Sequence, residues 1–274
     1  MTDEQRRHFE TLGFFLWKQL LSQDEMQVIS DAFDVAMRSA RGDYETLGLE
    51  QDGRGIPKRR EQIIPFFDYN PDVFYPLLDD ERFITVLETL LGDDFILTVS
   101  EGVIHAGGTD WHHDACGPEG FFSMKVAIYL DPLGPDDGCL SVIPGSHFKE
   151  YRDALRERIN NTGLQSEEIP GHYRICTNPG DVIFMNHKTF HAAISGNAGR
   201  RVIYFNVVQN TTPERDREHY DWLMSFLEGE TKHWGRFYSD RLIHSAGPRR
   251  KKMMQRAIEL GFGNTGAISH LQDS

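Results

Sequence analysis

The sequence predicts a mainly β fold with flanking helices, in which the core is an antiparallel sandwich or barrel of the jelly-roll (cupin-like) kind. Short runs of β-branched and aromatic residues fill the middle of the chain, and clusters of Gly, Pro, Asn and Asp separate them. Helical periodicity and capping residues mark the first third and the C-terminal part. We therefore expect one domain over residues 1–274, with a helical part at about 1–93, the jelly-roll core at about 94–210 and a second helical part at about 211–274.

Two helices are expected near the beginning of the chain. Thr2 with Gln5 forms a capping-box pattern that begins a helix ending near Gly13. Ser22 begins the second helix, which carries an apolar stripe at three- and four-residue spacing and has Gly42 as a plausible end. Each pattern gives one helix with one apolar face to bury.

A long loop and three further helices complete the helical parts. Residues 42–70 are polar and rich in Gly, Arg and Pro, so we expect a loop of the kind that often covers a site. A helix is expected over 80–91, with Gly92 as its C-cap. After the core, Pro213 marks the first turn of another helix, and residues 249–260 form the last.

The core is expected to contain six strands, each a short β-branched or aromatic run. These runs cover residues 95–100, 121–130, 138–143, 173–176, 181–186 and 201–208. One helix near residues 148–159 is expected to interrupt them. Many short strands at this spacing favour an antiparallel jelly roll over a parallel sheet.

The composition excludes several classes of function. A net charge of −13 disfavours general binding to nucleic acid or to an anionic membrane surface. No apolar run approaches the ~20 residues of a membrane span, and the polar first residues lack the apolar segment of a signal peptide. Three cysteines cannot all pair within one chain, which favours reduced thiols. We expect a cytoplasmic protein that acts on a small molecule, with no prediction of its oligomeric state.

The segment 109–114, Thr-Asp-Trp-His-His-Asp, is the most informative part of the chain. On a strand, His112 and Asp114 point to the same face while His113 points away, because side chains alternate. An imidazole and a carboxylate on one face are two adjacent ligands for a metal. His191, after the turn and strand at 180–186, is the best third ligand. Two histidines and one carboxylate form the facial triad of non-haem Fe(II) oxygenases, which leaves positions for a co-substrate and O2.

An arginine on the next strand extends the pattern. 2-Oxoglutarate chelates Fe(II) through its keto-acid end, and a buried guanidinium can clamp its other carboxylate with two hydrogen bonds. Arg200 and Arg201 are both candidates. Arg200 shares its strand face with polar Tyr204 and Asn206, whereas Arg201 shares its face with apolar residues, so parity favours Arg200 without excluding Arg201.

Three segments together resemble the phytanoyl-CoA dioxygenase (PhyH) family of Fe(II)/2-oxoglutarate-dependent oxygenases, from about residue 10 to 210. They are Trp111–Asp114, the run Asp-Gly-Cys-Leu-Ser-Val-Ile-Pro-Gly-Ser-His at 137–147, and the stretch 180–200 with Gly180-Asp181, Asn186-His187, His191, Asn197 and Arg200. The resemblance implies a double-stranded β-helix core, metal ligands at His112, Asp114 and His191, and a 2-oxoglutarate arginine at Arg200 or its neighbour.

The chain departs from the family at one position. Family members often carry a hydroxyl residue two positions after the distal histidine, where it contacts 2-oxoglutarate. Here that position is Ala193, and Ser195 or Thr189 are the nearby alternatives.

The resemblance implies Fe(II) as cofactor, and 2-oxoglutarate and O2 as co-substrates that become succinate and CO2. Halogenating relatives lack the carboxylate ligand, so Asp114 favours hydroxylation or another oxidative outcome over halogenation. Two alternatives stay open. One is a metal-dependent cupin-like enzyme that does not use 2-oxoglutarate, and the other is a CoA-ester hydroxylase, as the family name suggests.

Four further residues are candidates for a place in or near the site. Lys125 is expected either to face the pocket and assist 2-oxoglutarate or the substrate, or to lie at a strand edge with its amine in solvent. His113 is a candidate for substrate contact, since family members often carry a polar residue there. His187 is expected beside the metal site but not as a ligand. His105 faces the site only if its strand runs unbroken to His112, which Gly107 and Gly108 make doubtful.

Overall fold

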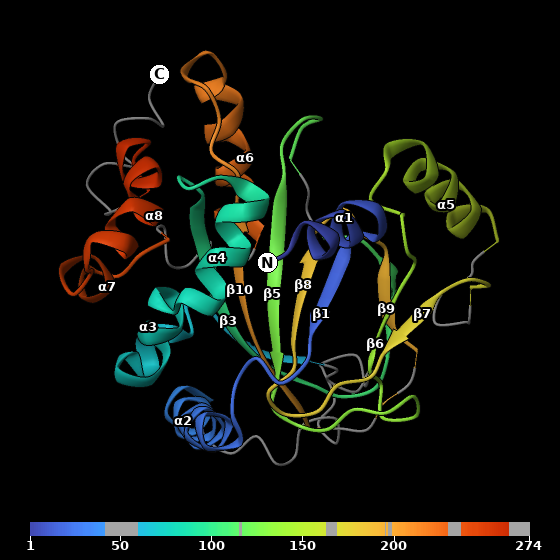
Figure 1. The fold of residues 1–274 in the computed structure, drawn as a ribbon, viewed down its shortest axis with the longest axis horizontal. Helices are drawn as coiled ribbons and strands as arrows, with labels where there is room; N and C mark the ends of the chain where they lie inside the picture. Colours follow the sequence, from blue (N-terminus) through green and yellow to red (C-terminus); the bar gives the residue numbers. More distant parts are fainter. Residues whose placement is uncertain are drawn as a thin grey trace.

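The structure is a computed structural model, and it describes residues 1–41, 60–114, 117–162, 169–194, 196, 199–229 and 237–262. Its core consists of two antiparallel sheets (Figure 1). The larger sheet contains, in order, β1 (Phe14–Trp17), β8 (Val182–Asn186), β5 (Ser123–Tyr129), β10 (Arg200–Val208), β3 (Ile96–His105) and β2 (Arg60–Ile63). The smaller sheet contains β4 (Thr109–His112), β9 (His191–Ala193), β6 (Leu140–Val142) and β7 (Tyr173–Ile175). This arrangement confirms the predicted mainly β, jelly-roll class.

Apolar side chains from both sheets meet between them. Val103, Ile183 and Val202 come from the larger sheet, and Val142 and Ile175 come from the smaller one. All five are almost completely buried. This shared core fixes how far apart the two sheets lie, and therefore how far a side chain on one sheet is from a side chain on the other.

The other face of the larger sheet is covered by helices. Ile203, Phe205 and Val207 of β10 point to this side and belong to a large apolar cluster. The cluster includes residues of α2 (Gln23–Arg41), α3 (Pro71–Asp79), α4 (Glu81–Leu91) and α8 (Pro248–Glu259). Figure 1 shows these helices, together with α7 (Asp240–His244), on one side of the larger sheet, with α5 (Lys149–Thr162) on the other side of the molecule near β7. Residues at alternate positions of β10 therefore face two different environments.

The N-terminal helices begin as the sequence predicts. In α1 (Asp3–Leu12), Gln5 N donates to Thr2 Oγ1 at 3.2 Å, and Thr2 N donates to Gln5 Oε1 at 2.8 Å, which completes a capping box. Ser22 and Glu25 exchange the same two bonds at the beginning of α2. The predicted helix at 80–91 is α4, with Asp80 as N-cap and Gly92 as C-cap.

Several elements were not predicted. The predicted loop at 42–70 is wrong over residues 60–63, which form β2, and over the 3-10 helix Phe67–Tyr69, while 42–59 lie outside the described residues. Helix α3 and strands β1 and β9 were also missed, and β3 continues five residues beyond the predicted end at 100. The missed strands are only three or four residues long, and turn residues did not set them apart as they did the equally short β6 and β7. Their pairing with longer neighbours forms them.

The C-terminal helices close the outer face. A 3-10 turn at Pro213–Arg215 leads into α6 (Asp216–Gly229), in agreement with the predicted helix after Pro213. Pro248 lies at the first turn of α8, close to the predicted beginning at 249. Across the described part of the chain, no helix combines the length and the apolar character needed to cross a membrane.

Candidate active site

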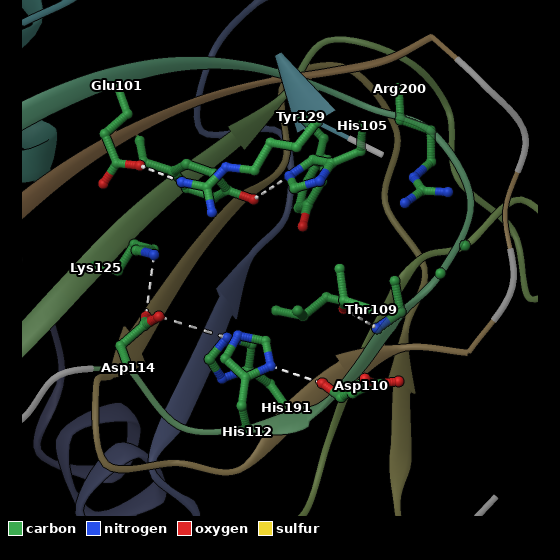
Figure 2. A pocket seen from close by; sticks show the side chains of 16 residues that line it. Glu101, His105, Thr109, Asp110, His112, Asp114, Lys125, Tyr129, His191 and Arg200 are labelled. Carbon is green, nitrogen blue, oxygen red and sulfur yellow. Dashed lines mark hydrogen bonds and ion pairs between the residues drawn. The ribbon is translucent and has the colours of Figure 1, made fainter. Parts of the chain in front are cut away.

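His112 and His191 are direct cross-strand partners. His112 ends β4 and His191 begins β9, and these two antiparallel strands pair at this position. Their rings lie 4.3 Å apart between centroids. Asp114 follows His112 by two residues, so its carboxylate lies on the same side (Figure 2). One ligand atom from each of the three residues lies within 4.8 Å of the others. The structure thus brings together the three residues predicted to bind metal.

Hydrogen bonds set which ring nitrogen of each histidine is available. His112 Nδ1 lies 2.7 Å from the backbone oxygen of Asp110, and His191 Nδ1 lies 3.0 Å from that of Thr189. A carbonyl oxygen only accepts, so each Nδ1 carries the proton and donates. The lone pair is then on Nε2 of both rings, which is the nitrogen a metal would bind.

The pKa values of His191 and Asp114 favour the protonation states of metal ligands. Burial lowers the pKa of His191 to about 3, against the opposing attraction of Asp114, because the charged imidazolium is disfavoured out of water. For Asp114, burial opposes ionisation, but Lys125 and the nearby histidines outweigh it and hold the carboxyl pKa well below its usual range. Neutral imidazoles and an ionised carboxylate are the forms that bind a cation, and this donor set suits Fe(II).

Asp114 is positioned by two neighbours. Its backbone N–H donates to His187 O at 3.0 Å, and Lys125 Nζ lies 3.0 Å from its Oδ2. Oδ1 faces His191 Nε2 at 3.9 Å. The carboxylate therefore has one oxygen toward the lysine and the other toward the two histidines (Figure 2).

A cavity of about 390 Å³ opens beside these three residues, between the two sheets. Residues from both sheets line it: Arg60, Glu101, His105, Gly108, Thr109, Asp110, His112, Asp114, Lys125, Tyr129, Gly138, Leu140, His191, Ala193, Arg200 and Tyr204. A pocket with convergent polar groups and perturbed titratable residues is the arrangement expected of an active site.

Arg200 and Arg201 have different surroundings. Arg200 is 5% exposed, lines the cavity and donates from Nη2 to Gly107 O at 2.7 Å. Burial lowers its pKa, because the guanidinium charge is less well solvated there. Arg201 points to the outer face, where Nη2 lies 2.7 Å from Asp131 and Nη1 lies 3.0 Å from Asp34. The alternative of Arg201 as a co-substrate ligand is therefore not supported.

Lys125 lies in the cavity, which decides between its two interpretations. Besides the ion pair with Asp114, its ammonium lies 4.6 Å from the centre of the Tyr204 ring. The opposing carboxylate Asp114 raises the pKa of Lys125 against the effect of burial. Lys125 is therefore a charged residue beside the candidate metal site.

The remaining three candidate histidines, His113, His187 and His105, have different surroundings. His113 points away from the cavity, against Phe190 and 2.5 Å from Arg156 Nη2, so its predicted contact with substrate is not supported. His187 is buried, its ring is bonded to Ser123 and Asn206, and its backbone oxygen accepts from Asp114 N. His105 lines the cavity even though its strand does not run unbroken to His112.

Several cavity residues were missed by sequence reasoning. Glu101 is buried and is the one acidic residue of β3, a signal that could have identified it. Tyr204 could have been identified by the strand parity that favoured Arg200, because the two residues share one face of β10. Arg60 had no such signal, because β2 was not predicted.

Thr109 supplies a hydroxyl group beside Ala193. The two residues are cross-strand partners, and Ala193 N donates to Thr109 Oγ1 at 2.8 Å. Both line the cavity. Of the two alternatives suggested by the sequence, Thr189 instead bonds to Gly13 O, and Ser195 lies outside the described residues.

The chain matches the family described as "Phytanoyl-CoA dioxygenase (PhyH)" over residues 9–202. A relative, "Dioxygenase lolE1" from Epichloe uncinata, is 27% identical over 209 residues, which cover 74% of this chain and 71% of the relative.

Solved structures share the fold. HygX from Streptomyces hygroscopicus, with nickel, 2-oxoglutarate and hygromycin B bound, has a TM-score of 0.59 at 19% identity over 77% of this chain and 88% of its own. EctD from S. alaskensis, with bound Fe, has a TM-score of 0.56 at 21% identity over 76% of this chain and 77% of its own.

Proposed function

The chain belongs to the phytanoyl-CoA dioxygenase family, and we propose that it oxidises a small organic metabolite with Fe(II) held by His112, Asp114 and His191. It is an Fe(II)- and 2-oxoglutarate-dependent oxygenase, for which O2 is the second co-substrate and succinate and CO2 are products. The cross-strand pairing of His112 with His191, with Asp114 on the same side, is the observation that carries the assignment of ligands. We propose further that the whole chain is one dioxygenase domain.

The ligand residues fit Fe(II) by their chemistry. Each imidazole presents Nε2, because its Nδ1 donates to a backbone carbonyl, and Asp114 presents an ionised oxygen. Fe(II) bound there supplies the redox chemistry that activates O2. The protein's part is to hold these three groups on one side, which leaves the other side open to the cavity.

Arg200 is the proposed partner of the distal 2-oxoglutarate carboxylate. Its buried guanidinium lies in the cavity, and the Gly107 carbonyl holds one end of it in place. Burial makes the guanidinium charge costly, and the carboxylate of a bound ligand would offset that cost. Thr109 is a further candidate contact, since its hydroxyl lies across from Ala193, where relatives often place a hydroxyl residue.

A small substrate is supported by the size of the cavity. About 390 Å³ has to accommodate both the co-substrate and the reacting part of the substrate. Among proteins of this fold, HygX has hygromycin B bound, which supports a small organic compound as the class. The carboxylate ligand Asp114 favours hydroxylation over halogenation. The alternative of a CoA-ester substrate stays a prediction.

The assignment is tested by iron content. We expect wild-type protein, loaded with Fe(II) without oxygen and desalted, to hold about one iron per chain, and His191→Ala to hold almost none. The matched control is His244→Ala, because His244 is exposed on α7. Equal iron in His191→Ala and wild type would contradict the proposed ligands.

A further inference from the structure

Glu101 is a carboxylate in an unusual place. It is 6% exposed, lies within the otherwise uncharged run 96–104 of β3, and lines the cavity that holds the candidate metal ligands. A buried charge is costly unless it is paired or serves a ligand. Neither the metal nor the 2-oxoglutarate assignment uses this residue.

Two side-chain amides donate hydrogen bonds to the Glu101 carboxyl group. Asn206 Nδ2 donates to Oε1 at 2.5 Å, and Gln62 Nε2 donates to Oε2 at 2.7 Å. The orientation of the Asn206 amide is fixed from behind, because its Oδ1 lies 2.9 Å from His187 Nε2. Each oxygen of Glu101 thus already accepts an N–H from a neutral amide. Amide donors stabilise the carboxylate and add no positive charge.

The neighbouring cations balance this charge only in part. Arg60 Nη2 lies 3.7 Å from Oε2, beyond hydrogen-bond distance, and the Arg60 side chain is 44% exposed. Lys125 is directed to Asp114, with Nζ 3.0 Å from Oδ2. A carboxylate has about four acceptor positions, and the two amides occupy two. Glu101 therefore keeps acceptor capacity within the cavity.

Glu101 and Arg200 both line the cavity, at positions far apart along the paired strands β3 and β10. Tyr204 pairs with Glu101 across β10 and β3, and Arg200 pairs with His105. Four residues of strand separate the two pairs, a spacing of roughly 13 Å. Figure 2 shows the two side chains far apart, with the candidate metal ligands facing the space between them. A cation bound by Glu101 would therefore not compete with 2-oxoglutarate bound by Arg200.

We infer that the primary substrate is a small amine, and that its protonated nitrogen donates to the Glu101 carboxylate. This inference rests on the proposed function, since it places a substrate in the same cavity. A charge-assisted bond from an ammonium group supplies a direct hydrogen bond from a cation, in addition to the two amide donors and the ion pair with Arg60 at 3.7 Å. The cavity of about 390 Å³ must also take 2-oxoglutarate, which restricts the amine to a small compound such as an amino acid.

The test uses a fixed panel of probes. The probes are the free amino acids without a basic side chain and small primary and secondary monoamines, each paired with its N-acetyl derivative, in which the nitrogen has no positive charge. Binding is measured by calorimetry on the protein, without oxygen, in the presence of Fe(II) and 2-oxoglutarate. We expect at least one free amine to bind and its N-acetyl derivative to bind roughly ten- to hundredfold more weakly.

Variants then assign the effect to Glu101. Glu101→Gln keeps the shape and removes the charge, and we expect it to weaken binding of that amine by roughly ten- to hundredfold. Glu157→Gln, on the exposed face of α5, is the matched control and should bind as wild type does. The comparison of amine with N-acetyl derivative needs no variant, so it remains decisive if Glu101→Gln does not fold.

The outcomes separate this inference from the proposed function. If no free amine binds, if acetylation has no effect, or if a folded Glu101→Gln binds the amine as wild type does, the inference is overturned. The proposed function is judged independently, by whether Fe(II) and 2-oxoglutarate bind in the absence of any probe. A protein that binds both but shows no amine selectivity keeps the function and loses the inference.

Discussion

Arg200 and Arg201 are adjacent in the chain but occupy opposite faces of β10. Arg200 lies in the cavity and donates to Gly107 O, whereas Arg201 lies under α2 and forms ion pairs with Asp34 and Asp131. Arg200 is thus a candidate to bind the co-substrate, whereas Arg201 connects β10 to α2 through its ion pair with Asp34.

Exchange of the two arginines for glutamine should therefore have different effects. We expect Arg200→Gln to raise the Kd for 2-oxoglutarate by roughly ten- to hundredfold, because it loses a charge-assisted pair. Arg201→Gln should leave that Kd within about twofold of wild type and lower the free energy of unfolding by about 1–3 kcal/mol. Calorimetric titration and urea denaturation measure the two quantities. Equal loss of 2-oxoglutarate affinity in both variants would contradict the assignment.

Strand parity explains why so much of the site was predictable. A period of two put His112 and Asp114 on one face and Arg200 opposite Arg201, and the structure has both arrangements. The partner strand β9 was not predicted, yet His191 was identified from its place after a turn and strand. Motif spacing carried information that local periodicity did not.

His105 shows where local patterns were insufficient. Gly107 and Gly108 do interrupt the chain between β3 and β4, as expected. His105 nevertheless faces the cavity, because its orientation depends on its pairing with Arg200 and not on continuity toward His112. Similarly, β2 and Arg60 could not be found without knowing that β3 offers an edge for pairing. Long-range strand pairing was the missing information.

Gly102 is expected to be essential for packing on the outer face of β3. A side-chain Cβ at this position would overlap the ring of Phe66, which is fully buried. We expect Gly102→Ala to lower the free energy of unfolding by about 1–3 kcal/mol, because a packed core does not absorb an added methyl group easily. Urea denaturation measures the change.

Gly247→Ala is the matched control, since nothing lies within 4 Å of a Cβ there and its φ is −69°. Gly247 is the N-cap of α8, where alanine is less favourable than glycine, so this substitution should lower the free energy of unfolding by at most about 1 kcal/mol, less than Gly102→Ala. Similar values for both substitutions would show that Phe66 does not constrain Gly102.

The stability of the fold is expected to fall below about pH 6.5, in part through His219. This residue is fully buried against Phe121 and Trp222, and burial, aided by Arg256, lowers its pKa to about 4. Between about pH 6.5 and pH 4 the unfolded chain therefore binds a proton at this residue that the folded chain does not. The free energy of unfolding then decreases as the pH falls, by up to about 1.4 kcal/mol per pH unit from this one group.

His219→Phe removes this contribution. We expect a shallower decline in the free energy of unfolding from pH 6.5 to 4.5 in this variant, measured by urea denaturation at each pH without metal. The exposed residue His244 provides the control, and His244→Phe should keep the wild-type slope. An unchanged slope in His219→Phe would mean that His219 is protonated equally in the folded and unfolded chains.

The most direct test of the account is the visible absorption spectrum of the protein with Fe(II) and 2-oxoglutarate in the absence of oxygen. A 2-oxoglutarate molecule chelated to Fe(II) gives a weak charge-transfer band. We predict that this band appears in wild type and in His244→Ala, and that it is absent from His191→Ala. A wild-type protein that binds iron but develops no band, or a His191→Ala protein that keeps it, would contradict the proposed centre.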